Sequence, residues 1–218
     1  MLSSPIKYLN HNTFKFHINL GGIFKTLSLL LCTSALLLTG CTQNSETSSV
    51  FSSWDDNYAR LEKLVFYKSA GRLGIFTTQN RLGASYELEG ISGGFIFSIK
   101  SPVGNNLATA TVTDNTLSFN IGGKTYKDDY AVAVFEEAFG VEIPADKLQH
   151  ILLGMPQGKV EKDTSGRIIS STWDGYKISY KGEVHEQGLV LPQNIEVQKN
   201  DYRVRITISS FELKQDRP

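Results

Sequence analysis

Apolar and polar residues alternate along most of the chain after residue 70. In residues 93–100, Phe95, Phe97 and Ile99 fall on one face and the side chains between them on the other. A period of two residues is typical of a β-strand with one buried face. Strands are predicted at residues 70–78, 81–89, 93–100, 107–113, 116–122, 158–162, 167–173, 176–181, 193–199 and 202–211. The turns between them are short, which favours an antiparallel sheet that curls.

Three other stretches have helical patterns. The first is residues 54–67, which follow Ser53, a good N-cap residue. Its apolar residues recur every three or four positions: Trp54, Tyr58, Leu61 and Val65. The second is residues 128–139, which begin with two aspartates that suit a helix N-terminus. A third, shorter helix is predicted at residues 145–152, directly after Pro144. We therefore expect a mainly β (α+β) domain with an N-terminal helix and two short helices.

The first 40 residues have a different pattern. Residues 1–25 carry lysines and no acid, and residues 27–38 form an apolar run. The run is shorter than the roughly 20 residues of a membrane-spanning helix, but it suits a secretory signal peptide. It ends in Leu38-Thr39-Gly40-Cys41, which resembles the lipobox of bacterial lipoproteins. The resemblance implies cleavage before Cys41 and covalent N-acyl and S-diacylglycerol groups on that residue. The alternatives are an ordinary signal peptide with an incidental cysteine, or a buried apolar helix.

This pattern divides the chain into three parts. Residues 1–40 are predicted to be a lipoprotein signal peptide, and residues 41–53, rich in Ser, Thr, Asn and Gln, a flexible tether. Residues 54–213 are predicted to form one domain. Cleavage removes Cys32, so Cys41 has no disulfide partner. It also removes Lys7, Lys15 and Lys25, which leaves 19 basic residues against 22 acidic ones. This balance gives no electrostatic reason to bind nucleic acid.

One motif could indicate an enzyme. Residues 90–94 match the G-x-S-x-G pattern of hydrolases, with Ser92 at its centre. That motif needs a strand before the serine and a helix after it. Here the residues that follow alternate as a strand, which favours a glycine-rich hairpin turn. Asp114 and His150 follow in the order of a hydrolase triad. A lipid esterase that uses Ser92 is therefore the enzymatic alternative.

A metal or acid–base site is not expected. After the signal peptide the chain contains only His150 and His185, and neither has cysteines or paired carboxylates at metal-ligand spacing. His185 is expected in a polar loop. The acidic pairs at residues 128–129 and 136–137 are better explained as a helix start and a solvated helix face. We predict no catalytic residue, no metal and no cofactor other than the acyl groups on Cys41.

The segment Ser101-Pro102-Val103-Gly104 joins two predicted strands. Ser at the first position, Pro at the second and Gly at the fourth are typical of a type I turn. This turn puts Val103 near its tip, where Asn, Asp or Gly is more usual. Val103 is either exposed at the tip or folded back onto the sheet, and the turn sequence alone does not decide between these.

The chain from about residue 54 to residue 213 resembles the LolB family of outer-membrane lipoprotein receptors. The resemblance rests on Gly71-Arg72-Leu73, Ser101-Pro102-Val103-Gly104, Ile143-Pro144, Leu148, Leu153-Gly154-Met155-Pro156, Leu191-Pro192 and Val204-Arg205-Ile206. The order and spacing of these motifs behind a lipobox carry the resemblance. The sequence departs from the family at three positions. Ile151 and Phe211 stand where the family usually has Trp, and Val103 stands where it usually has Leu.

The resemblance implies a fold and a function. The fold would be an incomplete antiparallel β-barrel of about eleven strands, with helices that cover a hydrophobic cavity. A non-enzymatic receptor of this family accepts acylated lipoproteins from the soluble periplasmic carrier LolA and inserts them into the outer membrane. The turn of Pro102, Val103 and Gly104 would contact membrane lipid during release. Thr42, in place of an inner-membrane retention Asp, implies a lipid anchor in the outer membrane that faces the periplasm. We expect a monomer.

Several alternating strands could line such a cavity. Their apolar faces carry Phe95, Phe97, Ile99, Leu117, Phe119, Ile121, Val204, Ile206 and Ile208. Periodicity does not distinguish a cavity lining from a filled core. A structural outer-membrane lipoprotein with a filled core is therefore the non-enzymatic alternative.

Overall fold

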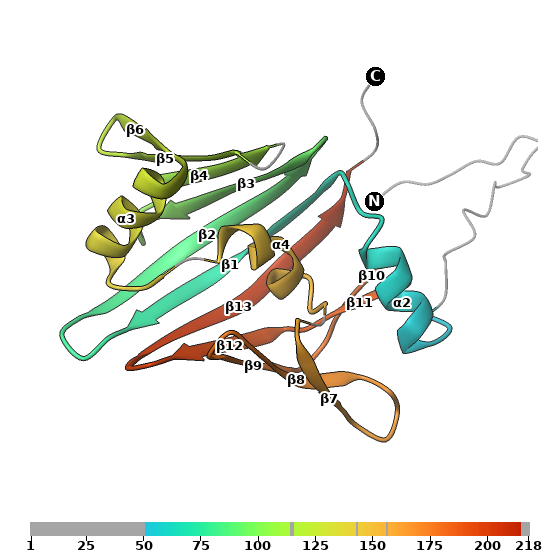
Figure 1. Ribbon diagram of the computed structural model, residues 1–218. Coiled ribbons are helices and arrows are strands. Elements are labelled where there is room, and N and C mark those ends of the chain that lie inside the picture. Colours follow the sequence, from blue (N-terminus) through green and yellow to red (C-terminus); the bar gives the residue numbers. More distant parts are fainter. Residues whose placement is uncertain (1–50, 114–115, 143, 156, 215–218) are drawn as a thin grey trace, which may run out of the picture. The chain divides into compact units, whose positions relative to one another are not determined.

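The computed structural model describes residues 51–113, 116–142, 144–155 and 157–214 (Figure 1). One antiparallel sheet contains β1 (Tyr67–Phe76), β2 (Arg81–Ile91), β3 (Gly94–Lys100), β4 (Asn106–Thr113), β5 (Thr116–Ile121), β6 (Lys124–Lys127), β7 (Lys159–Lys162), β8 (Ile168–Trp173), β9 (Tyr176–Lys181), β12 (Asn194–Lys199) and β13 (Tyr202–Leu213). A separate hairpin contains β10 (Val184–Glu186) and β11 (Leu189–Leu191). The helices are α2 (Trp54–Leu61), α3 (Asp128–Phe139) and α4 (Ala145–Leu152).

The sheet is built as a long meander. Its 11 strands have the order β6-β5-β4-β3-β2-β1-β13-β12-β9-β8-β7, so the first and last strands of the domain pair in its middle. β6 and β7 form the two edges, and within the described residues no pairing joins them. The expected fold, a mainly β domain with an incomplete antiparallel barrel, is confirmed.

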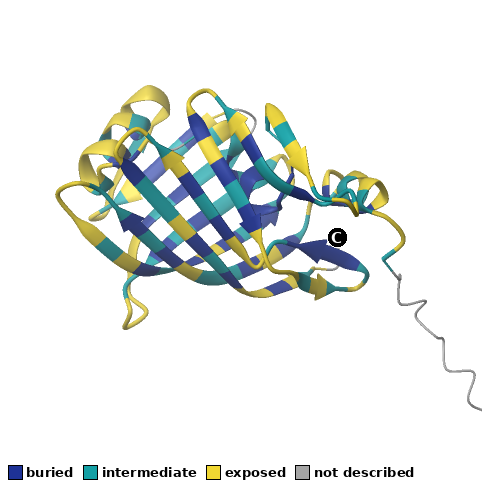
Figure 2. Ribbon diagram, turned by 90° about the horizontal axis from the view of Figure 1, so that it is seen from below, coloured by how far each residue is buried: buried dark blue, intermediate teal, exposed yellow. Residues whose placement is uncertain are grey.

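The helices α3 and α4 lie against the concave face of the sheet (Figure 1). Phe135 of α3 packs edge-on against Phe119 of β5, with ring centroids 5.3 Å apart. The strands alternate between buried and less buried residues, which gives the chequered pattern of Figure 2. The buried side chains of the sheet and of both helices form one hydrophobic core. The predicted alternation thus corresponds to a sheet with one face on that core.

The N-terminal helix is shorter than predicted. The expected helix covers residues 54–67, but α2 ends at Leu61. Val65, expected on the apolar stripe of the helix, is 43% exposed. Tyr67 already belongs to β1, which is hydrogen-bonded to β13 on one side and β2 on the other. Pairing on both sides of a strand outweighs a local helical preference, so the prediction for residues 62–67 was wrong.

Three short strands were not predicted. β6 has four residues, and β10 and β11 have three each, which is too short for alternation to be recognised. His185 was expected in a loop, but it lies in β10 opposite Val190. Its Nε2 atom lies 3.2 Å from a carboxylate oxygen of Glu183 at the surface.

The hairpin of β10 and β11 contacts α2 through a buried side chain. The side chain of Asn57 is buried, donates from Nδ2 to the carbonyl of Val190 and accepts from the N–H of Val190, both at 2.8 Å. One amide side chain therefore satisfies both backbone groups of Val190, as a neighbouring strand would.

Several predicted features lie outside the described residues. These are the signal peptide, most of the tether, the lipobox residues Leu38, Thr39 and Gly40, the lipidation residue Cys41, and the turn at Asp114.

Candidate functional site

A small apolar cavity lies between the concave face of the sheet and the helices α3 and α4. Its volume is about 60 Å³. It is lined by Leu73, Ile75, Phe97, Ile99, Phe135, Val141, Glu142, Pro144, Leu148, Ile151, Tyr176, Val197, Tyr202, Val204 and Ile206. Almost all of these side chains are apolar, and Glu142 is the one charged residue among the described residues of the lining. Such a lining favours an apolar guest.

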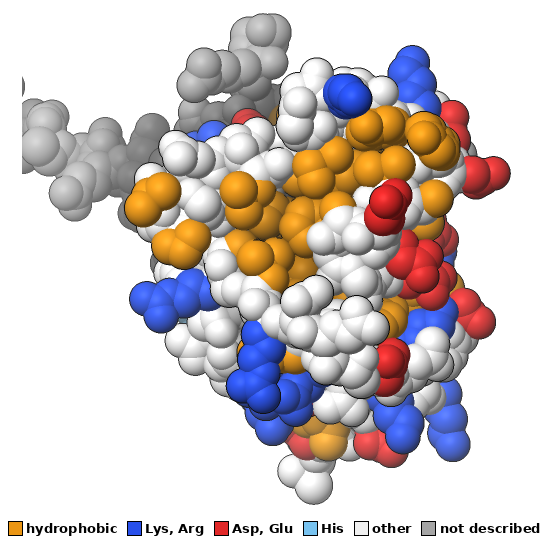
Figure 3. All heavy atoms as spheres, turned by 90° about the vertical axis from the view of Figure 1, so that its left-hand side faces the viewer, with side chains coloured by type: hydrophobic (Ala, Val, Ile, Leu, Met, Phe, Trp, Pro, Cys, Tyr) orange, Lys and Arg blue, Asp and Glu red, His pale blue; other side chains and the backbone are white. Residues whose placement is uncertain are grey.

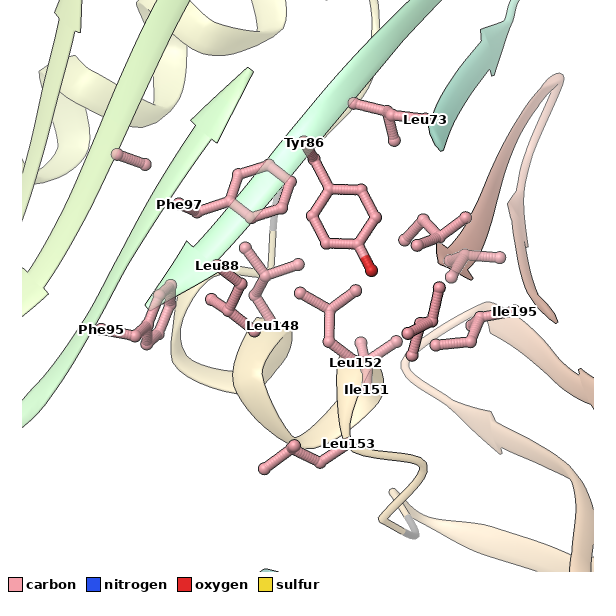
Figure 4. Close-up of a cluster of buried hydrophobic side chains, with 14 of the residues drawn as sticks. Leu73, Tyr86, Leu88, Phe95, Phe97, Leu148, Ile151, Leu152, Leu153 and Ile195 are labelled. Atoms are coloured by element: carbon pink, nitrogen blue, oxygen red, sulfur yellow. The ribbon is translucent and has the colours of Figure 1, made fainter. Parts of the chain in front are cut away.

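Helix α4 lies over the concave face of the sheet (Figure 1). Leu148, Ile151 and Leu152 project from it towards the strands, where Phe97 and Tyr86 face them (Figure 4). The rings of Tyr86 and Phe97 stack with their centroids 5.7 Å apart. The remaining cavity, about 60 Å³, is smaller than the roughly 150 Å³ in which a buried apolar site holds benzene. A long alkyl chain therefore requires the helices and the sheet to move apart.

The nine predicted cavity residues are distributed over different places. Phe97, Ile99, Val204 and Ile206 line the cavity. Phe95 and Leu117 instead line a groove beside it. The remaining three residues, which line neither the cavity nor the groove, are Phe119, Ile121 and Ile208.

Sequence reasoning missed part of the lining. Leu73 and Ile75 come from β1, Val197 comes from β12, and Leu148 and Ile151 come from α4. The strand residues carry the same alternating signal as those that were named, and the α4 residues follow helical spacing. Ile151, which departs from the family pattern, is fully buried in the lining.

An acidic groove of about 570 Å³ adjoins the cavity. Its described lining includes five carboxylates and neither Lys nor Arg: Asp128, Asp129, Glu142, Asp146 and Asp174. Glu142, Pro144 and Tyr176 line both the groove and the cavity, so these residues form the boundary between the two spaces.

Lys199 forms ion pairs with two carboxylates at this boundary. Lys199 Nζ lies 2.8 Å from Glu142 Oε2 and 3.9 Å from Asp174 Oδ2. The same atom lies 4.2 Å from the centroid of the Tyr176 ring, a cation–π contact. The hydrogen bond to Glu142 raises the pKa of Lys199 above its ordinary value. Burial raises the pKa of Tyr176 to about 12, so its ring stays neutral under the lysine.

The turn between β3 and β4 is closed by backbone hydrogen bonds. Gly104 N–H donates to the carbonyl of Ser101, and Ser101 N–H donates to the carbonyl of Asn105, both at 2.8 Å. Gly104 has a φ of 88°, which a residue without Cβ adopts at little cost. Val103 is 83% exposed, which rules out the alternative that it folds back onto the sheet.

This turn lies at the same end of the sheet as the turn between β1 and β2, because β2 and β3 are antiparallel. Apolar side chains gather on the face at this end of the domain (Figure 3). Leu107, the second residue of β4, is also partly exposed, at 39%. An apolar surface at one end of a domain is a candidate contact with a partner or a membrane.

The motif around Ser92 does not have the structure of a hydrolase elbow. Ser92 lies in an exposed turn between β2 and β3, so a strand follows it instead of a helix. His150 lies on α4, where burial lowers its pKa, and Asp114 is outside the described residues. No cluster of three or more metal-ligating residues occurs in the described part of the chain.

Comparison with known proteins decides the family. The model of a family described as outer membrane lipoprotein LolB matches residues 66–211, which is most of the domain. The chain belongs to the LolB family. Outer-membrane lipoprotein LolB of Stutzerimonas stutzeri is 22% identical over 86% of this chain and 96% of that protein. LolB of Pseudomonas aeruginosa is 23% identical over 87% of this chain and 98% of that protein.

Solved structures give a weaker likeness than the LolB sequences do. A LolA-superfamily protein from Nitrosomonas europaea has a TM-score of 0.48 and 9% identity, and covers 77% of this chain and 96% of that one. In the described part of this LolB-family chain, no helix is long and apolar enough to span a bilayer.

Proposed function

We propose that this LolB-family protein accepts lipoproteins from the periplasmic carrier LolA and inserts them into the outer membrane. The acyl chains of the cargo enter the cavity between the sheet and the helices α3 and α4. The observation that carries this proposal is the apolar lining of that cavity in a chain whose family model covers residues 66–211. No covalent chemistry is part of the proposed activity.

The energetics of acyl transfer support a receptor of this kind. An acyl chain of about sixteen carbons gains on the order of 12 kcal/mol on leaving water, at roughly 0.8 kcal/mol per CH₂. A lipoprotein cannot cross an aqueous compartment at that cost unless a protein shields its chains. Transfer therefore has to pass from one apolar site directly to another, and the cavity widens as the chain enters.

The anchor and the turn have separate roles in the proposal. Acyl groups on Cys41 hold the protein in the outer membrane with the domain in the periplasm. The turn of Pro102, Val103 and Gly104 contacts membrane lipid when cargo is released. Val103 would contribute only about 1–2 kcal/mol on entering the bilayer. That suits a transient contact during insertion, and the permanent attachment comes from the lipid anchor.

A transfer assay tests the proposal. Carrier loaded with radiolabelled lipoprotein is mixed with this protein, and the cargo bound to each is measured after separation. We expect cargo to move to this protein. Val204→Trp, which puts bulk into the cavity, should reduce this transfer, whereas Arg205→Trp on the exposed side of β13 should not. If no cargo moves, the receptor function is refuted.

The small cavity volume favours one second candidate, a structural outer-membrane lipoprotein. With a cavity of about 60 Å³, the interior resembles a filled core. This candidate predicts that no acyl chain binds even at high cargo concentration, and that Val204→Trp and Arg205→Trp behave alike.

A further inference from the structure

The boundary between the cavity and the groove is held by a lysine that is unusually enclosed. The side chain of Lys199 is 15% exposed, whereas the other described lysines with an ion pair are 29–48% exposed. Its partner Glu142 is the charged residue of the cavity lining, and Glu142 also lines the groove. This ion pair therefore lies where an alkyl chain would pass from the groove into the cavity.

The contacts of Lys199 join three separate parts of the chain. Lys199 ends β12, Asp174 lies in the turn between β8 and β9, and Glu142 lies between α3 and α4. The hydroxyl of Tyr202, at the start of β13, donates to the backbone carbonyl of Glu142 at 3.4 Å. Glu142 is thus attached to the sheet through these polar groups, and its neighbour Val141 is buried in the hydrophobic core.

We propose that the ion pair of Lys199 and Glu142 is a latch that controls the entry of an acyl chain into the cavity. The inference rests on the proposed acyl-binding function. Because the closed cavity is far smaller than a long acyl chain, Glu142 and Pro144 have to move away from β12 when the chain enters. That movement separates Glu142 from Lys199.

The geometry makes this latch easy to open. Asp174 already lies 3.9 Å from Lys199 Nζ, so the ammonium keeps a carboxylate partner after Glu142 has moved. The ring of Tyr176 stays beneath it. Glu142 gains solvent in the groove, where its side chain is already 45% exposed. Opening therefore leaves no charge buried and unpaired, the condition that makes breaking an ion pair costly.

The test measures the association rate constant of hexadecanoate with the mature chain. This chain carries Cys41→Ala, which removes the lipid anchor, so the protein needs no detergent. The variants are Glu142→Gln, Lys199→Gln and the pair of both. Loss of a partly exposed ion pair should raise the association rate constant by about two- to fivefold, and the double variant should exceed neither single one. Lys199→Arg keeps the charge and should bind like the wild type.

A matched control comes from the opposite face of the same strand. Glu196 of β12 pairs with Arg205 at 2.6 Å but does not line the cavity. Glu196→Gln should leave the rate unchanged. Thermal unfolding is measured for every variant. If the loss of any ion pair of β12 loosened the domain and so raised the rate, Glu196→Gln would also show a lower melting temperature and a faster rate.

The charge changes separate the latch from simple attraction of the probe. Glu142→Gln removes a negative charge and Lys199→Gln a positive one, so attraction of the carboxylate would shift their rates in opposite directions. A latch predicts that the association rate constant increases in both variants. Rates that shift in opposite directions, stay at the wild-type value, or rise equally in Glu196→Gln overturn the latch. If neither the wild type nor any variant binds hexadecanoate, the proposed cavity function itself fails.

Discussion

Replacing Val103 by Glu should impair membrane insertion without affecting the fold. The Val103 side chain is 83% exposed at the tip of the turn between β3 and β4. Substitutions at such positions change the free energy of unfolding by only about 0.5 kcal/mol. The transfer of valine into the bilayer is worth about 1–2 kcal/mol, and a glutamate loses it. Insertion should therefore slow by roughly 5- to 30-fold.

The assay separates acceptance from release. Carrier loaded with fluorescent lipoprotein is mixed first with the variant and then with liposomes of outer-membrane phospholipid. Cargo bound to the variant measures acceptance, and cargo in the liposomes measures insertion. Val65→Glu is the matched control, because Val65 is another exposed valine, at 43%, outside this turn. Val103→Leu, which introduces the usual residue of the family, should insert at least as fast as the wild type.

Three results would refute this reasoning. Equal insertion by Val103→Glu and by the wild type would remove the turn from the mechanism. Equal slowing by Val103→Glu and Val65→Glu would mean that any added surface charge hinders the approach to lipid. A loss of acceptance in Val103→Glu alone would place the turn at the carrier interface instead.

Further predictions concern the anchor, the hairpin, α4 and alkaline pH. Cys41→Ala exported in soluble form should still accept lipoproteins but deliver them to the wrong membrane, as fractionation would detect; failure to accept any would make the anchor part of acceptance. Asn57→Ala should lower the free energy of unfolding by about 2–3 kcal/mol in urea titrations, because both backbone groups of Val190 lose their buried partner; a loss below that of an exposed α2 substitution would contradict this. Leu148→Ala should cost about 2–5 kcal/mol and enlarge the cavity, so hexadecanoate should bind more readily despite lower stability. Burial raises the pKa of Tyr86 to about 12, above its ordinary value of about 10. Between about pH 10 and 12 the unfolded state therefore loses the tyrosine proton first, and the free energy of unfolding should fall as the pH rises. Tyr86→Phe should make this fall with pH less steep.

The sheet could be predicted from the sequence because its signal is local. The alternation of Phe95, Phe97 and Ile99 gives the buried face of β3 directly, and these residues are all buried. The end of α2 could not be predicted in this way. Residues 62–67 continue the helical spacing. Pairing with β2 and with β13, both distant in the sequence, makes Tyr67 part of a strand. The strands β10 and β11 are too short for any periodic signal.

The site was less accessible to sequence reasoning than the fold. Alternation predicts the sheet face on which Phe97 and Phe119 lie, and both side chains are buried. Only Phe97 lines the cavity, and this depends on the positions of α3 and α4, which alternation does not give. The turn sequence predicted the position of Val103 and left its direction open. The latch was not predicted at all, because Glu142 and Lys199 are 57 residues apart and no local pattern connects them.

The most direct test of the proposed function is to locate the acyl chain inside the protein. A lipoprotein acylated with a diazirine fatty acid is transferred from its carrier, irradiated, and its adducts are mapped by mass spectrometry. The proposed function predicts adducts on residues that line the cavity, such as Phe97, Leu148 and Ile206, and none on Arg205 of the exposed face. Adducts confined to the outer surface, or none on the cavity lining, would contradict it.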